Sequence, residues 1–485
     1  MIRRGLCLCT AFLSLAAWNY GETLELEDCR ISAGPSFPSM RARCGTLERN
    51  LDPDDPASPS IELRVVVVPA INLKPEPDPV VPIAGGPGQG SVEFYAGWAN
   101  AFGHLRRDRD ILLVDQRGTG GSARLDCPFD PDLVAGDYSH ARTIADTREC
   151  LAGLPYDPKY FTTSIAVRDL EAVRQALGYP ALNLYGVSYG SRVAQHFARR
   201  FPESTRTVVL DGVVPPQLPL GPDIAIEAQR AVDEIFARCN EDAACRKAFG
   251  DVAAHFSELR DRLDAEPVEV RLPNPVSGAF ETMSFGRMEF AAAIRLLAYH
   301  PSTIALIPLV VDAAWQGNYV PLAAQYQLTV AELSDALALG MHNSVMCSED
   351  VPYFDDRQID EAALEASYIG PMQLESLEAM CSVWPVGPVD SGFREPLSTD
   401  IPVLLLSGTA DPITPPAYAD LAARSLKRAW LLTGQDQGHG QLAVGCMPKL
   451  IAEFVAERSL AEADTSCIED SFIMPFFLDF AGPAP

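Results

Sequence analysis

A serine flanked by glycines is the feature of this sequence that most directly suggests chemistry. Ser188 is the central residue of "GVSYG", with Gly186 two positions before it and Gly190 two positions after it. The apolar run 182–187 predicts a strand before the serine, and 191–200 predicts a helix after it. A turn this tight strains the serine backbone and needs glycine where strand and helix crowd each other. The pattern therefore predicts an exposed nucleophilic hydroxyl above the end of a strand.

A nucleophilic serine needs an acid and a base from later strands, in that order along the chain. Histidine accepts the serine proton near neutral pH, and an aspartate fixes the histidine tautomer and stabilises its cation. Asp411 follows the apolar run "PVLLLSG", and His439 follows "AWLLTG". We therefore predict a catalytic triad of Ser188, Asp411 and His439. Asp211 is the alternative acid because it ends the predicted strand "TVVLDG", and a structural role in a glycine turn is the alternative for His439.

Donors for a developing oxyanion must come from a loop near the start of the chain and from the residue after the nucleophile. The loop "AGGPGQG", residues 84–90, follows a predicted strand at a suitable place. Pro87 has no N–H group, so the backbone N–H groups of Gly86 and Tyr189 are the predicted donors. Each such donor is typically worth about 3–4 kcal/mol in the transition state.

The predicted strands that carry these residues are short and almost continuously apolar, as in a parallel sheet buried on both faces. Helical segments alternate with them, which predicts an α/β fold with a mostly parallel sheet and helices on both faces. A long helical, acidic stretch interrupts the alternation once and predicts an inserted, mainly helical cap. The expected organisation is a signal peptide at 1–21, a core at 22–213, the cap at 214–399 and the rest of the core at 400–485.

The first residues and the cysteines both indicate export. Arg3 and Arg4 precede an apolar run, 6–17, that is typical of a signal peptide and too short to span a bilayer. A buried or disordered N-terminus is the alternative. Ten cysteines follow the run, and an even number in an exported chain predicts disulfides. Pairing between sequence neighbours is our hypothesis, and reduced, buried cysteines are the alternative: 29–44, 127–150, 239–245, 347–381 and 446–467.

Composition narrows the possible partners of the chain. Its 485 residues carry a net charge of −27, which disfavours binding to nucleic-acid phosphates. No segment after the N-terminus reaches 18 uninterrupted apolar residues, so we expect no stable membrane insertion. We find no zinc-binding spacing of cysteine or histidine, and we expect neither a metal nor a cofactor. We expect a monomer in the periplasm or outside the cell.

Taken together, the motifs resemble one enzyme family. "GGPGQG", "DQRGTGGS", "GVSYG", "VVLDGVV", "SGTADPITPP" and "GHG" are similar, in this order, to motifs of the exported tripeptidyl aminopeptidase and proline iminopeptidase family of α/β-hydrolases. The resemblance spans about residues 60–467. It implies Ser188 as nucleophile, Asp411 as acid and His439 as base, with the oxyanion loop at 85–88. Ala84 is a departure, because many relatives carry Asn or His there.

The resemblance also implies that acidic residues of the cap bind the free amino end of a substrate. Glu349 and Asp350 in "VMCSEDVP" are the candidates, and solvated charges at a helix end are the alternative. The predicted function is a serine aminopeptidase that acts on peptides and releases a tripeptide or a single residue such as proline. The alternatives are an esterase or lipase with the same triad and a non-catalytic binding protein on a hydrolase scaffold.

Overall fold

The structure of the chain is a computed structural model that describes residues 24–34, 37–127, 139–274, 277–356 and 359–483. The predicted signal peptide, 1–21, lies outside the described residues. Within the described part of the chain, every helix is too short or too polar to cross a lipid bilayer.

One nine-stranded sheet organises the core, in the order β1-β2-β3-β5-β4-β6-β7-β10-β11. The first three strands form an antiparallel meander that pairs antiparallel with β5, and the six strands from β5 to β11 run parallel. This topology confirms the predicted α/β fold with a mostly parallel sheet. The strands are β1 (Glu27–Ile31), β2 (Met40–Asn50), β3 (Ser60–Val68), β4 (Glu76–Ile83), β5 (Arg109–Val114), β6 (Leu182–Val187), β7 (Thr205–Asp211), β10 (Val403–Gly408) and β11 (Ala429–Gly434).

Helices cover both faces of this sheet, which explains why its central strands are almost wholly apolar. Successive residues of a strand point to opposite faces, and in β10 Val403 and Leu405 join one core cluster while Leu404 and Leu406 join another. The first cluster includes residues of α4 (Thr163–Ala176), α5 (Tyr189–Arg200) and α16 (Pro416–Ala423). The second includes residues of α1 (Ser91–Trp98), α2 (Gly103–Arg106) and α17 (Met447–Glu457).

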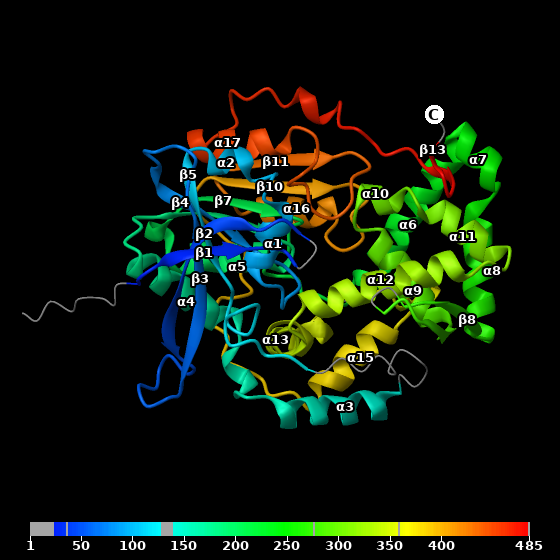
Figure 1. The fold of residues 1–485 in the computed structure, drawn as a ribbon, viewed down its shortest axis with the longest axis horizontal. Coiled ribbons are helices and arrows are strands. Elements are labelled where there is room, and N and C mark those ends of the chain that lie inside the picture. Colours follow the sequence, from blue (N-terminus) through cyan, green and yellow to red (C-terminus); the bar gives the residue numbers. More distant parts are fainter. Residues whose placement is uncertain (1–23, 35–36, 128–138, 275–276, 357–358, 484–485) are drawn as a thin grey trace, which may run out of the picture.

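The segment between β7 and β10 builds a separate apolar cluster beyond the sheet. In Figure 1 its helices gather on the side toward which the arrowheads of β10 and β11 point. It also contains a hairpin, β8 (Val268–Pro273) and β9 (Phe280–Phe285), that the sequence reading did not predict. Its helices are α6 (Ile224–Glu241), α7 (Ala243–Phe249), α8 (Val252–Ala265), α9 (Arg287–Leu297), α10 (Pro301–Ile304), α11 (Ile307–Trp315), α12 (Val320–Ala336), α13 (Leu339–Val345), α14 (Glu361–Ala366) and α15 (Met372–Cys381).

The last residues of the described chain pack against these cap helices, although the sequence analysis assigned residues 400–485 to the core. Phe476 lies in the cap cluster and under the guanidinium of Arg238, and the backbone N–H of Phe477 donates to Ala305 O. Burial of these aromatic side chains explains the return. Figure 1 shows the C-terminal segment with β12 (Phe477–Asp479) and β13 (Gly482–Pro483) crossing from the core to the helices around α7. The domain boundaries drawn from the sequence remain predictions.

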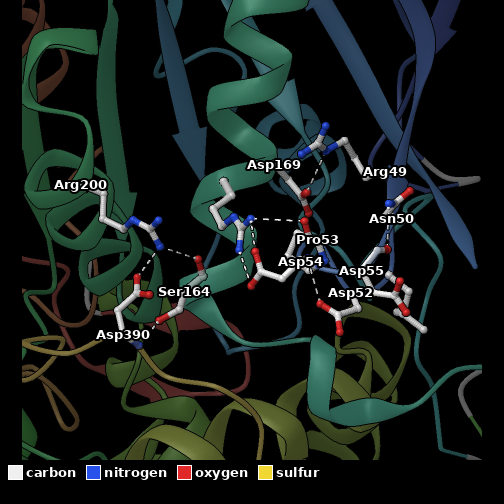
Figure 2. Close-up of polar contacts among 12 residues, drawn as sticks. Arg49, Asn50, Asp52, Pro53, Asp54, Asp55, Ser164, Asp169, Arg200 and Asp390 are labelled. Atoms are coloured by element: carbon white, nitrogen blue, oxygen red, sulfur yellow. Dashed lines mark hydrogen bonds and ion pairs between the residues drawn. The ribbon is translucent and has the colours of Figure 1, made fainter. Parts of the chain in front are cut away.

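Helix α4 is held to its neighbours by polar contacts along its length (Figure 2). Near its first turn, Ser164 Oγ accepts the backbone N–H of Asp390, and Arg200 donates to both Ser164 O and Asp390 Oδ2. Further along, Arg168 donates to Asp54 of the loop after β2, and Arg49 of β2 pairs with Asp169. The beginning of α4 is therefore fixed relative to both α5 and the segment between α15 and β10.

All five predicted disulfides are present, with sulfur atoms within bonding distance in each neighbour pair: Cys29–Cys44, Cys127–Cys150, Cys239–Cys245, Cys347–Cys381 and Cys446–Cys467. Cys347–Cys381 joins the π-helix Met346–Asp350 to α15 inside the cap. Cys127–Cys150 attaches α3 (His140–Gly153) to the loop that follows β5. Three of the bridges therefore join strands, helices or loops of the core, and two lie within the cap.

Candidate active site

Ser188 occupies the sharp turn that the sequence predicts, between the last residue of β6 and the first residue of α5. Its φ and ψ are 56° and −127°, a backbone conformation that costs energy for a residue with a Cβ atom. A Cβ on Gly186 would lie 2.2 Å from Gly190 O, and one on Gly190 would lie 2.2 Å from Ile83 O. Both glycines are thus required by close backbone approach, and Ser188 stands at the carboxyl end of the parallel strands.

Asp411 and His439 meet at the same edge of the sheet. Asp411 comes three residues after the end of β10, and His439 comes five residues after the end of β11. His439 Nδ1 lies 2.8 Å from Asp411 Oδ2. Asp411 is fully buried, and the His439 side chain is 9% exposed. The remaining Asp411 oxygen accepts the backbone N–H groups of Ile413 and Thr414.

The charges of this pair stabilise each other. Burial raises the pKa of Asp411. The charge of the His439 ring and the hydrogen bonds to the carboxylate lower that pKa by more than burial raises it, so it lies below its usual value. Burial lowers the pKa of His439, but the Asp411 carboxylate more than offsets this and holds that pKa above its usual value. The aspartate therefore favours a proton on the imidazole, which is the electrostatic setting that a general base next to a serine needs.

Thr414 is a third member of this cluster that the sequence reading did not find. Its hydroxyl donates to Asp411 Oδ2 at 2.8 Å and lies 3.1 Å from His439 Nδ1. The side chain is fully buried, so the contact restricts both the carboxylate and the ring. Thr414 follows Asp411 by three residues in "DPIT", but threonine in a turn after an aspartate has no distinctive pattern, so spacing alone could not have singled it out.

Asp211, the alternative acid, has other partners. Its carboxylate accepts the backbone N–H groups of Gln441 and Leu442 and the hydroxyl of Tyr185, the last at 2.6 Å. Burial raises the pKa of Asp211 to about 6, although these hydrogen bonds and the nearby His439 lower it. The structure brings Asp411, and not Asp211, into hydrogen-bond contact with His439 Nδ1. Asp211 instead holds the chain that follows the histidine against the sheet.

The predicted oxyanion loop lies directly against the serine. A Cβ on Gly85 would lie 2.9 Å from Ser188 Cβ and 3.5 Å from Ser188 Oγ. Gly86 has a φ of 108°, which favours glycine. Tyr189 is the first residue of α5, and the first N–H groups of a helix have no partner within it. Gly85 of the predicted oxyanion loop therefore lies against Ser188, and Tyr189 follows Ser188 directly in the chain, while the donor roles of Gly86 and Tyr189 remain predictions.

The serine and the histidine lie at one edge of the sheet without a mutual hydrogen bond. Among the hydrogen bonds of the described residues, none joins Ser188 Oγ to the His439 ring. The loop that carries His439 nevertheless lies near the turn at Ser188, because a Cβ on Gly440 would lie 4.0 Å from Cγ2 of Val187, the residue before the serine. His439 is also fixed from the cap side, where its backbone N–H donates to Tyr299 O at 2.7 Å.

Glu349 and Asp350 lie in the interior, which excludes solvated charges at a helix end. They are 1% and 0% exposed. Both Asp350 oxygens accept from Arg192 of α5, and Oδ1 also accepts the backbone N–H of Leu220. Glu349 accepts from the backbone N–H and the hydroxyl of Thr163. Burial raises the pKa of Glu349 to about 7, although the Thr163 hydrogen bonds lower it.

Metal binding has no support among the side chains that the structure describes. In those residues no group of three or more His, Cys, Asp or Glu side chains is placed to hold an ion.

Asp115, in the loop after β5, has a structural role: its carboxylate accepts the backbone N–H groups of Val92 and Gly121.

Comparison with known proteins agrees with this geometry. Residues 366–467, which include Asp411 and His439, match the family described as "TAP-like protein". The chain is 26% identical to serine protease Hip1 of Mycobacterium tuberculosis (strain ATCC 25618 / H37Rv) over 92% of its length and 91% of that protein. It is 27% identical to carboxylesterase B of the same strain over 91% of the chain and 89% of that protein.

A further relative has a more specific name. The chain is 28% identical to tripeptidyl aminopeptidase of Streptomyces lividans over 54% of its length and 52% of that protein. The family match, these relatives and the strand order of the sheet point to the same conclusion. The chain is an enzyme, a serine hydrolase with an α/β-hydrolase fold, and its residues 366–467 match the TAP-like family.

Proposed function

We propose that the protein is an exported serine aminopeptidase that releases short N-terminal units from peptides, either a tripeptide or a single residue such as proline. The observation that carries the proposal is the buried Asp411–His439 hydrogen bond at the sheet edge where Ser188 stands in its strained turn. The five disulfides support an oxidising compartment outside the cytoplasm.

In the proposed mechanism, Ser188 Oγ attacks the carbonyl carbon of the scissile amide while His439 Nε2 accepts the hydroxyl proton. The oxyanion that forms accepts hydrogen bonds from the backbone N–H groups of Gly86 and Tyr189. His439 then donates its proton to the leaving amine, and the N-terminal unit remains on Ser188 as an acyl ester. Water, deprotonated by His439, hydrolyses this ester. Asp411 stabilises the imidazolium in both steps.

The relatives support a peptidase, and one of them supports an esterase as the second candidate. Hip1 is named a serine protease and the Streptomyces relative a tripeptidyl aminopeptidase, whereas carboxylesterase B carries the name of an ester hydrolase. The cap favours an aminopeptidase, because a wall near Ser188 would limit how much of a peptide fits before the scissile bond. Direct binding of the amino end by Glu349 and Asp350 stays a prediction. It requires an ammonium group to displace their present partners.

The proposal is tested with matched chromogenic amides that carry one, two or three residues, each with a free and an acetylated amino end, beside a short acyl ester. An aminopeptidase hydrolyses one length of free amide best and loses ~30-fold or more in kcat/KM on acetylation, because the desolvated ammonium contact is worth about 2–5 kcal/mol. Ser188→Ala is the control and abolishes every activity. Turnover of the ester alone would make the esterase the better account, and equal rates on free and acetylated amides would reject recognition of the free amino end.

A further inference from the structure

A chain of buried hydrogen bonds runs from the cap to the residue after the nucleophile. Glu349 Oε2 accepts the hydroxyl of Thr163 at 2.8 Å, and Oε1 accepts the backbone N–H of Thr163 at 2.6 Å. Thr163 Oγ1 lies 2.5 Å from the hydroxyl of Tyr189. Gln116 Nε2 donates to the same Tyr189 hydroxyl at 3.0 Å. Glu349, Thr163 and Tyr189 are each at most 1% exposed, so no bulk water competes for these groups.

When Glu349 is ionised, its carboxylate fixes the direction of every hydrogen bond in this chain. A carboxylate only accepts, so the single hydroxyl proton of Thr163 must point to Glu349. Thr163 Oγ1 can then only accept from Tyr189, and Tyr189 can then only accept from Gln116, whose amide nitrogen is a donor. The four groups therefore have one consistent arrangement, which Glu349 sets from one end.

The chain joins four elements whose relative placement determines the geometry around Ser188. Glu349 lies in the π-helix Met346–Asp350 of the cap, which Cys347–Cys381 anchors. Thr163 is the first residue of α4, whose neighbouring turn is fixed by the contacts of Ser164 and Asp390 in Figure 2. Gln116 belongs to the loop after β5. Tyr189 begins α5 directly after the serine.

From this geometry we infer that Glu349 is a positioning residue, which acts through Thr163 and the Tyr189 side chain to hold the first turn of α5 where its Tyr189 N–H faces the oxyanion. The inference rests on the proposed function, because it assumes that Ser188 is the nucleophile and that the Tyr189 N–H is an oxyanion donor. It differs from amino-end binding in its consequence. A misplaced oxyanion donor weakens the transition state of every substrate, whatever its amino end.

Two adjacent threonines provide a matched pair of variants. Thr163→Val removes the hydroxyl of the chain and keeps the shape of the side chain. Thr162→Val makes the same change one residue earlier, where the hydroxyl is equally buried but donates to Pro388 O at 2.9 Å. Thr162→Val loses one buried hydrogen bond and Thr163→Val loses two, so both variants carry a structural cost, which thermal unfolding measures separately from kcat. Thr163→Ser restores a hydroxyl and serves as the rescue.

We expect Thr163→Val and Glu349→Gln to lower kcat by about tenfold on free amide, acetylated amide and acyl ester alike, with KM nearly unchanged. This is less than the ~10²–10³-fold cost of deleting an oxyanion donor outright. Tyr189→Phe, which keeps the ring, is expected to behave in the same way. Thr162→Val and Thr163→Ser are expected to stay within about threefold of the wild type. Thermal unfolding of each variant identifies any that does not fold.

Two results would overturn the inference. If Thr163→Val matches Thr162→Val in kcat on all three substrates, the chain does not position the oxyanion donor. If Glu349→Gln raises KM for free amides only, Glu349 binds the amino end instead. Labelling of Ser188 by a fluorophosphonate, measured in the same variants, separates this failure from failure of the proposed function, since an unlabelled wild type would reject the nucleophile itself.

Discussion

Two buried aspartates both come at the ends of apolar runs that form neighbouring strands, but they have different partners in space. Asp211 is the last residue of β7, Asp411 follows β10 by three residues, and β7 and β10 pair in parallel. Both side chains are 0% exposed. Asp411 contacts the imidazole of His439, whereas Asp211 contacts backbone N–H groups and the hydroxyl of Tyr185. The contrast shows that the partner of a carboxylate, and not its place on the sheet, decides its chemistry.

The two pKa values express this contrast. Burial raises the pKa of both carboxyls, but the cation of His439 and several hydrogen bonds reverse the shift at Asp411. At Asp211 the hydrogen-bond donors are neutral groups, and the charge of His439 has a smaller influence. Burial therefore dominates, and the pKa of Asp211 rises to about 6. A charged partner offsets the desolvation of a carboxylate where neutral donors offset only part of it. Asp411 is therefore suited to stabilise a positive histidine during catalysis, and Asp211 to hold a loop.

The largest effect is expected from Asp411→Asn. The variant keeps the size of the side chain but removes the charge that stabilises the His439 cation and allows the wrong tautomer, so kcat should fall by roughly 10⁴-fold. Steady-state kinetics on the best amide substrate, with circular dichroism to verify folding, measures this. A fall of less than tenfold would return Asp211 to consideration as the acid.

Asp211→Asn should have a smaller effect on activity and a clear effect on stability. An amide cannot accept as many hydrogen bonds as the carboxylate, which leaves a buried N–H group of Gln441 or Leu442 without its partner at a cost of about 1–3 kcal/mol. Displacement of the adjacent His439 should lower kcat by roughly 10²-fold at most. Urea unfolding and kinetics on the same preparation test both statements. A variant that is more stable than the wild type, or as inactive as Asp411→Asn, would contradict the structural role assigned to Asp211.

The smallest expected effect is a shift in the pH dependence of kcat/KM, which should differ between the Asp411 and Asp211 variants. The base form of His439 is neutral, and its pKa is raised, so wild-type activity should increase with pH through a midpoint above 6.5. Asp411→Asn removes the carboxylate that raises this pKa and leaves the lowering effect of burial, so the midpoint should move to lower pH. Asp211→Asn should move it in the same direction but less, because its carboxylate also raises the pKa of His439. A larger shift in Asp211→Asn would contradict the assignment.

Local patterns were sufficient to predict the core strands and the residues that follow them. The apolar runs that became β6, β7 and β10 are continuous because helices cover both faces of the sheet, and the order of nucleophile, acid and base follows the order of strands. Neighbour pairing of cysteines was also correct. The prediction was less complete elsewhere. Strands β1 and β2 on one side of the main sheet, and the separate hairpin β8–β9 of the cap, carry many polar residues and have no comparable apolar run.

Contacts between distant segments could not be predicted in this way. The hydroxyl of Thr163 meets Glu349 across 186 residues of sequence, and nothing in the local pattern of either residue signals the other. The Asp211 carboxylate reaches Gln441 across 230 residues. Glu349 and Asp350 stood out from the sequence as charges next to a cap helix, but only the packing of the cap on α4 and α5 places them in the interior. Spacing therefore identified the candidate reactive groups and not the groups that hold them in place.

Covalent labelling of the nucleophile tests the central claim most directly. The purified wild-type protein is incubated with a fluorophosphonate probe, and the adduct is located by peptide mass mapping, with Ser188→Ala and Asp411→Asn in parallel. A nucleophile activated by His439 predicts one adduct, on the peptide that contains Ser188, with no adduct in Ser188→Ala and much slower labelling in Asp411→Asn. A folded wild-type protein that reacts at another residue, or that hydrolyses substrate without reacting with the probe, would contradict the account.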